Sequence, residues 1–363
     1  MRAAKTVFIV GAGASNEVGI EFGRSFVDIV SGKLNYRFDR GCLVCGEGGD
    51  GDILEVIERL ARDRPSQNSF LAAAQRLREG LGFARSIDSF LDVHRDDKKI
   101  QLLGKVAIAK TILDQEENSC IRISGSTTDF QNVAMLNDSW FVNLARGLND
   151  GVRREEIKRI FEKLSFIVFN YDRCVEHFLY NAPQRHYGIS DAETKTALET
   201  LTILHPYGKI ANLPWQGGEA VPFGYKISPA NLVMMASNIK TYTEQIEDDN
   251  TFRAIKSEIA KAETLVFLGF SYLDLNMDLI HPTIKCVAQN VFGTAYGISS
   301  SDVDQVKKQL RGSVGQNLSL STIPNGVVRV VPERLYIRSD LKCAGLLGEY
   351  SRSLFATGQR SSN

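Results

Sequence analysis

A glycine-rich segment follows the first apolar run of the chain. Gly11-Ala12-Gly13-Ala14-Ser15 comes directly after Thr6–Val10. Glycines at such a turn let the backbone approach a phosphate, and a following helix N-terminus offers free N–H groups and partial positive charge. The segment departs from the usual dinucleotide fingerprint, because Asn16 occupies the third glycine position. The alternative is a tight strand–helix turn that binds nothing.

Two polar side chains end a second apolar run. Asn170 and Asp172 stand in Phe169-Asn170-Tyr171-Asp172. A carboxamide and a carboxylate two residues apart at a strand end can both point into a crevice, where they suit ribose hydroxyls and a bound water. The alternative is a turn in which Asp172 caps the next helix.

A histidine follows a third apolar run. His205 comes directly after Leu201–Leu204, and Pro206 and Gly208 fix a turn around it. With an ordinary pKa of about 6.5, an imidazole can accept a proton near neutral pH. A structural, hydrogen-bonded histidine is the alternative.

Two further segments carry candidate ligand-binding residues. Arg24 ends the stretch Gly19–Arg24 and is placed either to face a phosphate or carboxylate or to lie in solvent. Gly269 and Ser271 follow the apolar run Leu265–Leu268, at a turn that admits a phosphate or ribose or simply joins a strand to a helix.

We expect strands and helices to alternate along the chain and to position these residues. A doubly wound, mostly parallel, Rossmann-like α/β sheet is the fold that such alternation predicts, with ligands at the carboxyl ends of its strands. We expect this core over residues 1–40 and 164–335. A large helical insertion over 41–163 and a C-terminal helix with a disordered tail over 336–363 complete the domain organisation. The expected strands are Thr6–Val10, Phe166–Phe169, Leu201–Leu204, Leu265–Leu268, Val291–Ile298 and Val327–Val331.

The overall composition excludes several classes of protein. The 363 residues carry 43 basic and 43 acidic side chains, which disfavours direct nucleic-acid binding. No apolar run approaches the roughly 18–20 residues that cross a bilayer, and Val7–Val10 is too short for a signal peptide. The six cysteines are few and mostly scattered, which is typical of reduced thiols. We therefore expect a cytoplasmic protein with no membrane association.

Taken together, the strand-end segments resemble the motifs of the sirtuin family. Gly11–Ser15 resembles its Gly-Ala-Gly-x-Ser loop, and Gly19–Arg24 its Gly-Ile-Pro-Asp-Phe-Arg segment, with Glu21 and Phe22 replacing Pro and Asp. Phe169–Asp172 resembles Gln-Asn-Ile-Asp. His205 matches the histidine of the His-Gly motif, although Pro206 and Tyr207 precede Gly208. Gly269–Ser271 resembles Gly-Thr-Ser.

A closer likeness is to the divergent sirtuin-like domains of bacterial antiphage defence systems. Arg85–Leu91 looks like a Ser-Ile-Asp-x-Phe-Leu segment common in that group, but we read it as a packed amphipathic helix and assign it no chemistry. The resemblance implies an NAD hydrolase that depletes NAD during infection. NAD is then a substrate, with Asn170 and His205 catalytic, and Gly11, Ala12, Gly13, Ser15, Arg24, Asp172, Gly269 and Ser271 binding it.

The cysteines argue against protein deacylation. Deacylating sirtuins carry a zinc module of two Cys-x-x-Cys pairs between the His-Gly and Gly-Thr-Ser motifs, since structural zinc is tetrahedral. The stretch from His205 to Gly269 contains no cysteine. The one such pair, Cys42 and Cys45, lies far upstream and supplies only two ligands, so we expect no metal.

Other functions remain open from the sequence. An NAD-dependent deacylase and an NAD or ADP-ribose sensor without turnover are the alternatives, while the missing third glycine disfavours a Rossmann dehydrogenase. An NAD hydrolase needs silencing in its own cell, so we expect a homo-oligomer. A partner of the DNA-translocase ATPase type follows from the family resemblance only.

Overall fold

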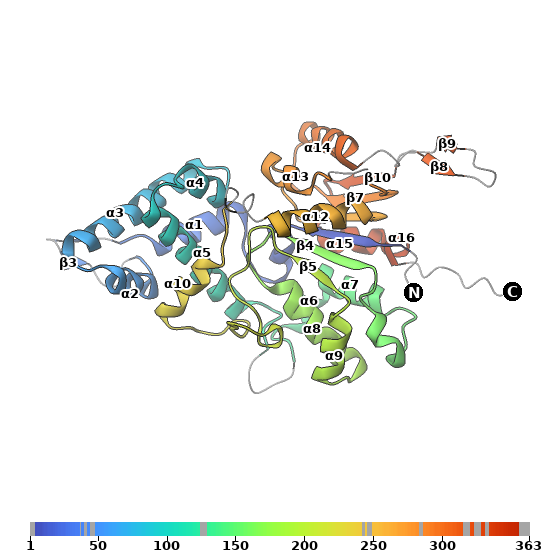
Figure 1. Ribbon diagram of the computed structural model, residues 1–363, viewed down its shortest axis with the longest axis horizontal. Coiled ribbons are helices and arrows are strands. Elements are labelled where there is room, and N and C mark those ends of the chain that lie inside the picture. Colours follow the sequence, from blue (N-terminus) through green and yellow to red (C-terminus); the bar gives the residue numbers. More distant parts are fainter. Residues whose placement is uncertain are drawn as a thin grey trace.

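The chain combines a sheet lobe with a helical lobe, which lie side by side in Figure 1. The computed structural model describes residues 4–36, 38–39, 42–43, 48–123, 129–241, 244, 249–282, 286–314, 320–322, 328–330 and 334–355.

A six-stranded sheet forms the centre of the sheet lobe. Its order is β10-β7-β6-β1-β4-β5, and every pair of neighbours is parallel. The strands are β1 (Thr6–Val10), β4 (Leu164–Val168), β5 (Thr202–Leu204), β6 (Thr264–Leu268), β7 (Asn290–Thr294) and β10 (Leu335–Arg338). When only the six strands of this sheet are numbered, in chain order, their arrangement is the 3-2-1-4-5-6 order of dinucleotide-binding folds. The predicted doubly wound α/β fold is confirmed.

The central strand β1 is apolar on both faces because helices cover both faces of the sheet. All five of its residues are buried, as are those of β4 and β6. Val7 and Ile9 belong to one hydrophobic core, while Phe8 and Val10 belong to the other. Because successive side chains face two hydrophobic cores in turn, these strands appear in the sequence as continuous apolar runs.

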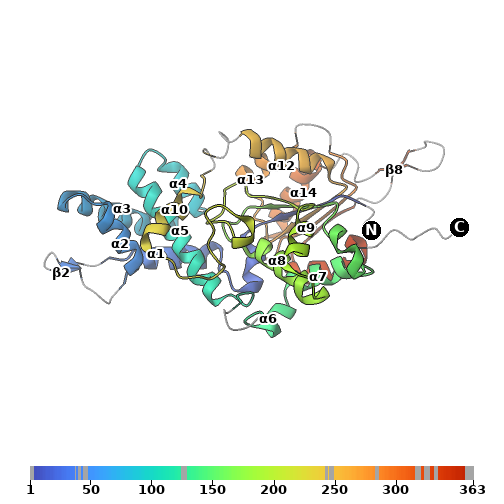
Figure 2. The same ribbon diagram turned by 60° about the horizontal axis from the view of Figure 1, so that its bottom comes forward.

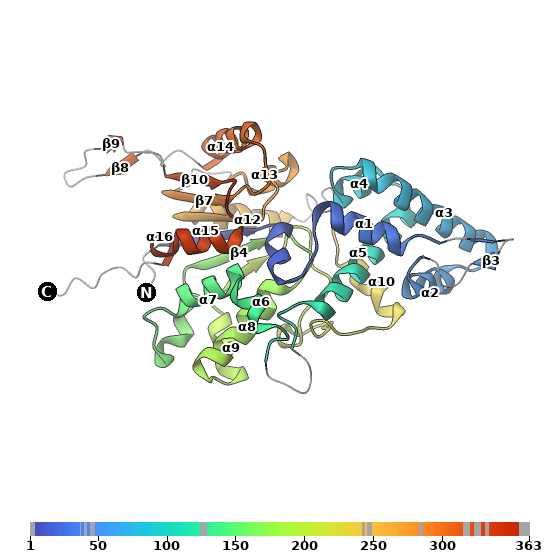
Figure 3. The same cartoon turned by 180° about the vertical axis from the view of Figure 1, so that it is seen from behind.

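Different parts of the chain supply the two helical layers. One core packs against α12 (Asp249–Lys261), α13 (Asp274–Ile280) and α14 (Ser300–Val314). The other packs against α6 (Val133–Asn137), α7 (Trp140–Asn149), η3 (Arg154–Arg159), α8 (Cys174–Tyr187), α9 (Asp191–Leu198), α15 (Cys343–Glu349) and α16 (Ser351–Phe355). Figure 3 shows α15 and α16 on this second face.

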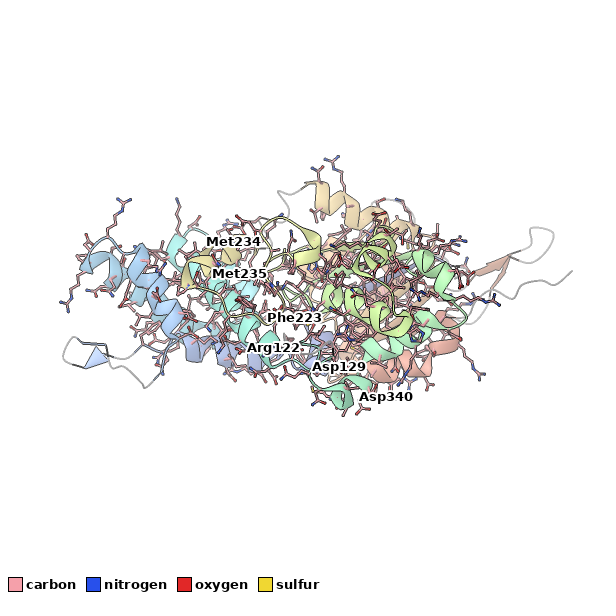
Figure 4. The ribbon with its side chains drawn as sticks, turned by 90° about the horizontal axis from the view of Figure 1, so that it is seen from below. Arg122, Asp129, Phe223, Met234, Met235 and Asp340 are labelled. Carbon is pink, nitrogen blue, oxygen red and sulfur yellow. The ribbon has the colours of Figure 1, made fainter. Side chains whose placement is uncertain are left out.

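The helical lobe gathers segments from two places in the chain. It contains α1 (Gly23–Lys33), α2 (Gly51–Leu60), α3 (Arg64–Gly80), η2 (Leu81–Phe83), α4 (Ile87–Val93), α5 (Lys98–Asn118) and α10 (Pro229–Ser237). Helix α5 packs against α10, α3 and α1. Figure 4 shows Met234 and Met235 on α10 in this lobe and Phe223 where the two lobes meet. The lobe therefore differs from the insertion expected over 41–163. It begins earlier, with α1, and includes the distant α10, while α6 and α7 pack on the sheet instead.

Several expected elements differ in extent. The glycine-rich turn leads into a 3-10 helix, η1 (Ala12–Val18), and α1 begins only at Gly23. The expected strand at 327–331 is not in the main sheet, because β9 (Val328–Val330) pairs only with β8 (Leu320–Thr322) in an antiparallel hairpin. The last strand of the main sheet, β10, instead crosses the boundary expected at residue 335.

Two small features lie at the ends of the molecule. The hairpins β2 (Phe38–Asp39) with β3 (Cys42–Leu43) and β8 with β9 lie at opposite ends in Figure 2. The tail at 357–363 and much of the glycine-rich stretch at 41–52 lie outside the described residues. Within the described part of the chain, no helix combines the length and hydrophobicity needed to span a membrane.

Candidate functional site

A cavity of about 640 Å³ opens at the carboxyl ends of the central strands. Residues that follow β1, β4, β5, β6 and β7 line it, and α1, α4 and α5 of the helical lobe close the opposite wall. The topology places the switch point of the sheet between β1 and β6, where the chain leaves the centre in opposite directions. Open α/β sheets bind ligands at such a point. Of the residues predicted from the sequence, the cavity is lined by Gly11, Ala12, Gly13, Arg24, Asn170, Asp172, Gly269 and Ser271.

The two glycine turns pack against each other at the base of this cavity. A Cβ on Gly11 would lie 2.5 Å from the Gly269 carbonyl oxygen, and one on Gly269 would lie 2.1 Å from the Ala14 nitrogen. Gly269 also has φ +56°, a conformation that favours glycine. Glycine is thus required here by the close approach of two backbones.

In the same packing, hydrogen bonds within the chain occupy two N–H groups that the sequence analysis expected to bind a phosphate. The Gly11 N–H donates to the Leu268 carbonyl at 2.9 Å, and the Gly13 N–H donates to the Gly269 carbonyl at 3.1 Å. These two donors are therefore occupied by the chain itself. A diphosphate at this turn would meet the backbone mainly around Ala12, at the start of η1.

Asn170 lies at the cavity wall and is oriented by Ser15. Its Nδ2 donates to the Ser15 Oγ at 2.8 Å, and both residues are buried. Its Oδ1 is buried and has no hydrogen-bond partner among the residues that the structure describes. A buried amide oxygen without a donor carries a free-energy penalty that a ligand hydroxyl or a water relieves. Ser15 itself does not line the cavity, so it acts behind Asn170.

Asp172 both contacts the start of the next helix and lies in the cavity wall. Its Oδ1 accepts from the Cys174 N–H at 3.0 Å, at the start of α8, and the residue also lines the cavity. Only 4% of Asp172 is exposed.

His205 is not part of the cavity wall. Its Nδ1 donates to the Asn170 carbonyl at 3.2 Å, and its Nε2 lies 2.8 Å from Oε1 of Glu176. Both ring nitrogens face oxygens that only accept hydrogen bonds, so neither is available to a substrate in this arrangement.

Glu176, the carboxylate behind His205, belongs to a buried charged cluster. Its Oε1 also accepts from Lys209 Nζ at 3.0 Å. Burial by itself would raise the pKa of Glu176, but the charges and hydrogen bonds of His205 and Lys209 hold it well below the usual range.

Arg24 and Ser271 lie at the exposed rim. Arg24 pairs with Asp28 at 3.0 Å, one turn along α1, and donates to the Gly82 carbonyl. Its side chain is 71% exposed, so it is accessible to an anion entering the cavity.

Sequence reasoning missed a second set of polar residues on the cavity wall. The Tyr171 hydroxyl donates to Oδ1 of Asp88, and the Tyr207 hydroxyl donates to Oδ1 of Asn276 at 2.7 Å. All four residues line the cavity. Asp88 lies in the Arg85–Leu91 segment, to which the sequence assigned no chemistry, and its helical periodicity gave no sign that α4 faces the strand ends.

Tyr171 and Tyr207 belong to an aromatic wall. Phe169 lies 5.9 Å from Tyr207 and 5.0 Å from Phe270 between ring centroids, both in edge-to-face geometry. Such a surface suits a planar heterocycle.

A buried ion pair joins the two lobes beside the cavity. Arg173 follows Asp172, and its guanidinium contacts both carboxylate oxygens of Glu116 at the end of α5, with neither side chain exposed. Glu116 Oε2 also accepts from the Gly224 N–H at 3.1 Å. The pair ties the position of the helical wall to the end of β4.

Metal ligands are not gathered among the described residues. No group of three or more His, Cys, Asp or Glu side chains is placed there to hold an ion. Cys120, Cys174, Cys286 and Cys343 are buried and are not joined in disulfides. The side chains of Cys42 and Cys45 lie outside the described residues.

Compared with known proteins, the chain matches no protein-family model and no curated protein.

Proposed function

We propose that the protein is an NAD hydrolase, which cleaves the bond between nicotinamide and ribose and yields ADP-ribose. One observation carries the proposal. Eight of the ten residues predicted for an NAD site line a single cavity, which lies at the switch point of a sheet with dinucleotide-binding strand order. Its size of about 640 Å³ lies within the range of pockets that enclose small ligands.

Asn170 is the centre of the proposed chemistry. Nicotinamide leaves as positive charge develops on the ribose, as in other glycosidic cleavages. The unpartnered Oδ1 of Asn170 would accept a hydrogen bond from the attacking water or a ribose hydroxyl, and Ser15 holds the amide for that task. Asp172 would position the ribose from the same loop, while the diphosphate would lie against Gly11–Gly13 with Arg24 at the rim.

His205 can accept a proton in the proposed reaction only under one condition. To accept a proton from the substrate it must first give up one of its two partners, Glu176 or the Asn170 carbonyl. Where it keeps both, its role is to position the Asn170 loop.

The cellular role remains part of the same proposal. NAD depletion in antiphage defence and a partner ATPase follow from the resemblance to divergent sirtuin-like domains. The homo-oligomer follows from the need to silence an NAD hydrolase, and the cytoplasmic location from the composition. The cavity itself supports only the first step, the binding of NAD.

A sensor that binds NAD or ADP-ribose without turnover is the second candidate. The observation that favours it is the engagement of both His205 nitrogens and of the Gly11 and Gly13 N–H groups within the chain. An NAD-dependent protein deacylase is the third, and it requires an acyl-lysine substrate.

One assay separates the three. The purified protein is incubated with NAD, and free nicotinamide is followed by chromatography with and without an acetyl-lysine peptide. Release that does not depend on the peptide supports the hydrolase, and release only with the peptide supports the deacylase. NAD binding by calorimetry without any release supports the sensor.

A further inference from the structure

Asp88 and Tyr171 form a hydrogen-bonded pair on the cavity wall, contributed by different lobes. Asp88 is the second residue of α4, and Tyr171 follows Asn170 directly at the end of β4. The Tyr171 hydroxyl donates to Oδ1 of Asp88. The pair therefore places a carboxylate beside the loop that carries Asn170.

The other acids of the cavity either accept hydrogen bonds from backbone N–H groups or lie at its exposed rim. Glu17 accepts from the Trp140 and Ala344 N–H groups at 2.8 and 3.0 Å and so anchors the starts of α7 and α15. Asp172 caps α8. Glu21 is exposed at the rim. Asp88 remains as the carboxylate whose side-chain partner, Tyr171, is itself a cavity residue.

We propose that Asp88 accepts the proton of the attacking water in the cleavage of NAD, and that Tyr171 positions it. The inference rests on the proposed hydrolase function. It replaces the proton-accepting role expected for His205, whose nitrogens are engaged by Glu176 and the Asn170 carbonyl.

The step balances without any further reactant. The water oxygen bonds to the ribose carbon as the bond from that carbon to the nicotinamide nitrogen breaks. The electron pair of that bond stays on the ring nitrogen and neutralises its positive charge. One proton of the water passes to the Asp88 carboxylate and later to solvent.

The electrostatic environment of Asp88 suits this task. Burial raises the pKa of its carboxyl above the usual range, and the hydrogen bond from Tyr171 opposes the rise. Carboxyl groups that titrate closer to neutral pH are effective proton acceptors. The other ionisable groups around the pair are Tyr207 and Glu244, which act on Tyr171, Lys105, which pairs with Glu244, and the wall residues Arg24 and Arg85.

The test is the pH dependence of nicotinamide release by full-length variants. Asp88→Asn keeps a hydrogen-bond acceptor for Tyr171 but removes the base, so kcat should fall by about 10²–10⁴-fold and the acidic limb of the profile should vanish. Tyr171→Phe should lower kcat less than Asp88→Asn does and shift the acidic limb to higher pH, because the carboxyl loses the hydrogen bond that positions it and lowers its pKa. Asp96→Asn, at an exposed position just after α4, should match the wild type.

The outcomes separate this inference from the proposed function. Wild-type turnover with an unchanged rate and acidic limb in Asp88→Asn would overturn the inference alone. If Asp88→Asn does not fold, an unshifted limb in Tyr171→Phe would overturn it instead. No nicotinamide release by the wild type at any pH would overturn both.

Discussion

Nδ1 of His205 donates to the backbone carbonyl of Asn170 at 3.2 Å, so the two residues predicted to be catalytic are joined through the main chain. The imidazole contacts the loop that carries Asn170 but does not line the cavity. His205 is thereby placed to hold Asn170 against the cavity, with Glu176 fixing the other side of the ring.

This geometry predicts different effects of two substitutions at His205. His205→Ala removes the hydrogen bond to the Asn170 carbonyl and should lower kcat by at least tenfold. His205→Asn retains a donor near the position of Nδ1 and should recover most of that loss, with the acidic limb of the pH profile unchanged. His186→Ala, at an exposed histidine of α8, is the control. Equal inactivation by Ala and Asn at residue 205 would instead favour a proton-accepting role.

The contact between the two glycine turns predicts a large stability effect. Gly269→Ala imposes a left-handed conformation that costs about 1–2 kcal/mol, and its Cβ would overlap the Ala14 nitrogen, which adds to that cost. Gly312→Ala, in the exposed face of α14 with nothing near its Cβ, should be neutral or stabilise by up to about 1 kcal/mol. Urea unfolding compares the two free energies. A Gly269→Ala protein as stable as the wild type would show that the turns do not pack as described.

The strand-end residues were predictable because a parallel sheet brings all its carboxyl ends to one edge. That rule placed Asn170, Gly269 and the first glycine turn in one cavity without knowledge of side-chain contacts. It fails for His205 because Glu176 of α8 and the Asn170 carbonyl engage both ring nitrogens, while Tyr207, two residues further on, lines the cavity. Asp88 was not predictable, since its position depends on how α4 packs across the lobe boundary, and helical periodicity carries no such information.

The buried ion pair between Arg173 and Glu116 predicts a second stability effect. Glu116→Ala leaves the fully buried guanidinium without its carboxylate and should lower the free energy of unfolding by about 3–5 kcal/mol. Glu162→Ala removes an exposed partner of Arg159 and should have no measurable effect. The contrast is measured by urea unfolding, and equal stability of the two variants would contradict a joining role for the buried pair.

The buried imidazole of His177 should make the free energy of unfolding depend on pH. Burial lowers the pKa of His177 to about 3, against the hydrogen bond to the Ile121 carbonyl, and Phe223 stacks on its ring. The unfolded chain takes up this proton below about pH 6.5 while the folded chain does not. The histidine therefore contributes stability above pH 6.5 that falls by up to about 1.4 kcal/mol per pH unit as the pH drops toward 3.

The matching experiment measures the unfolding free energy between pH 7 and 4. His177→Gln should flatten the pH slope by up to one proton, whereas His186→Gln should leave the slope unchanged. An identical slope in wild type and His177→Gln would show that His177 is protonated in the folded protein.

The central claim is that the cavity cleaves NAD at Asn170, and nicotinamide release by matched variants tests it most directly. Asn231→Ala, at an exposed position of α10, serves as the control for Asn170→Ala. We expect wild type and Asn231→Ala to release nicotinamide at the same rate, and Asn170→Ala to bind NAD while its kcat falls by at least 10²-fold. Full activity in Asn170→Ala, or no release by the wild type, would contradict the account.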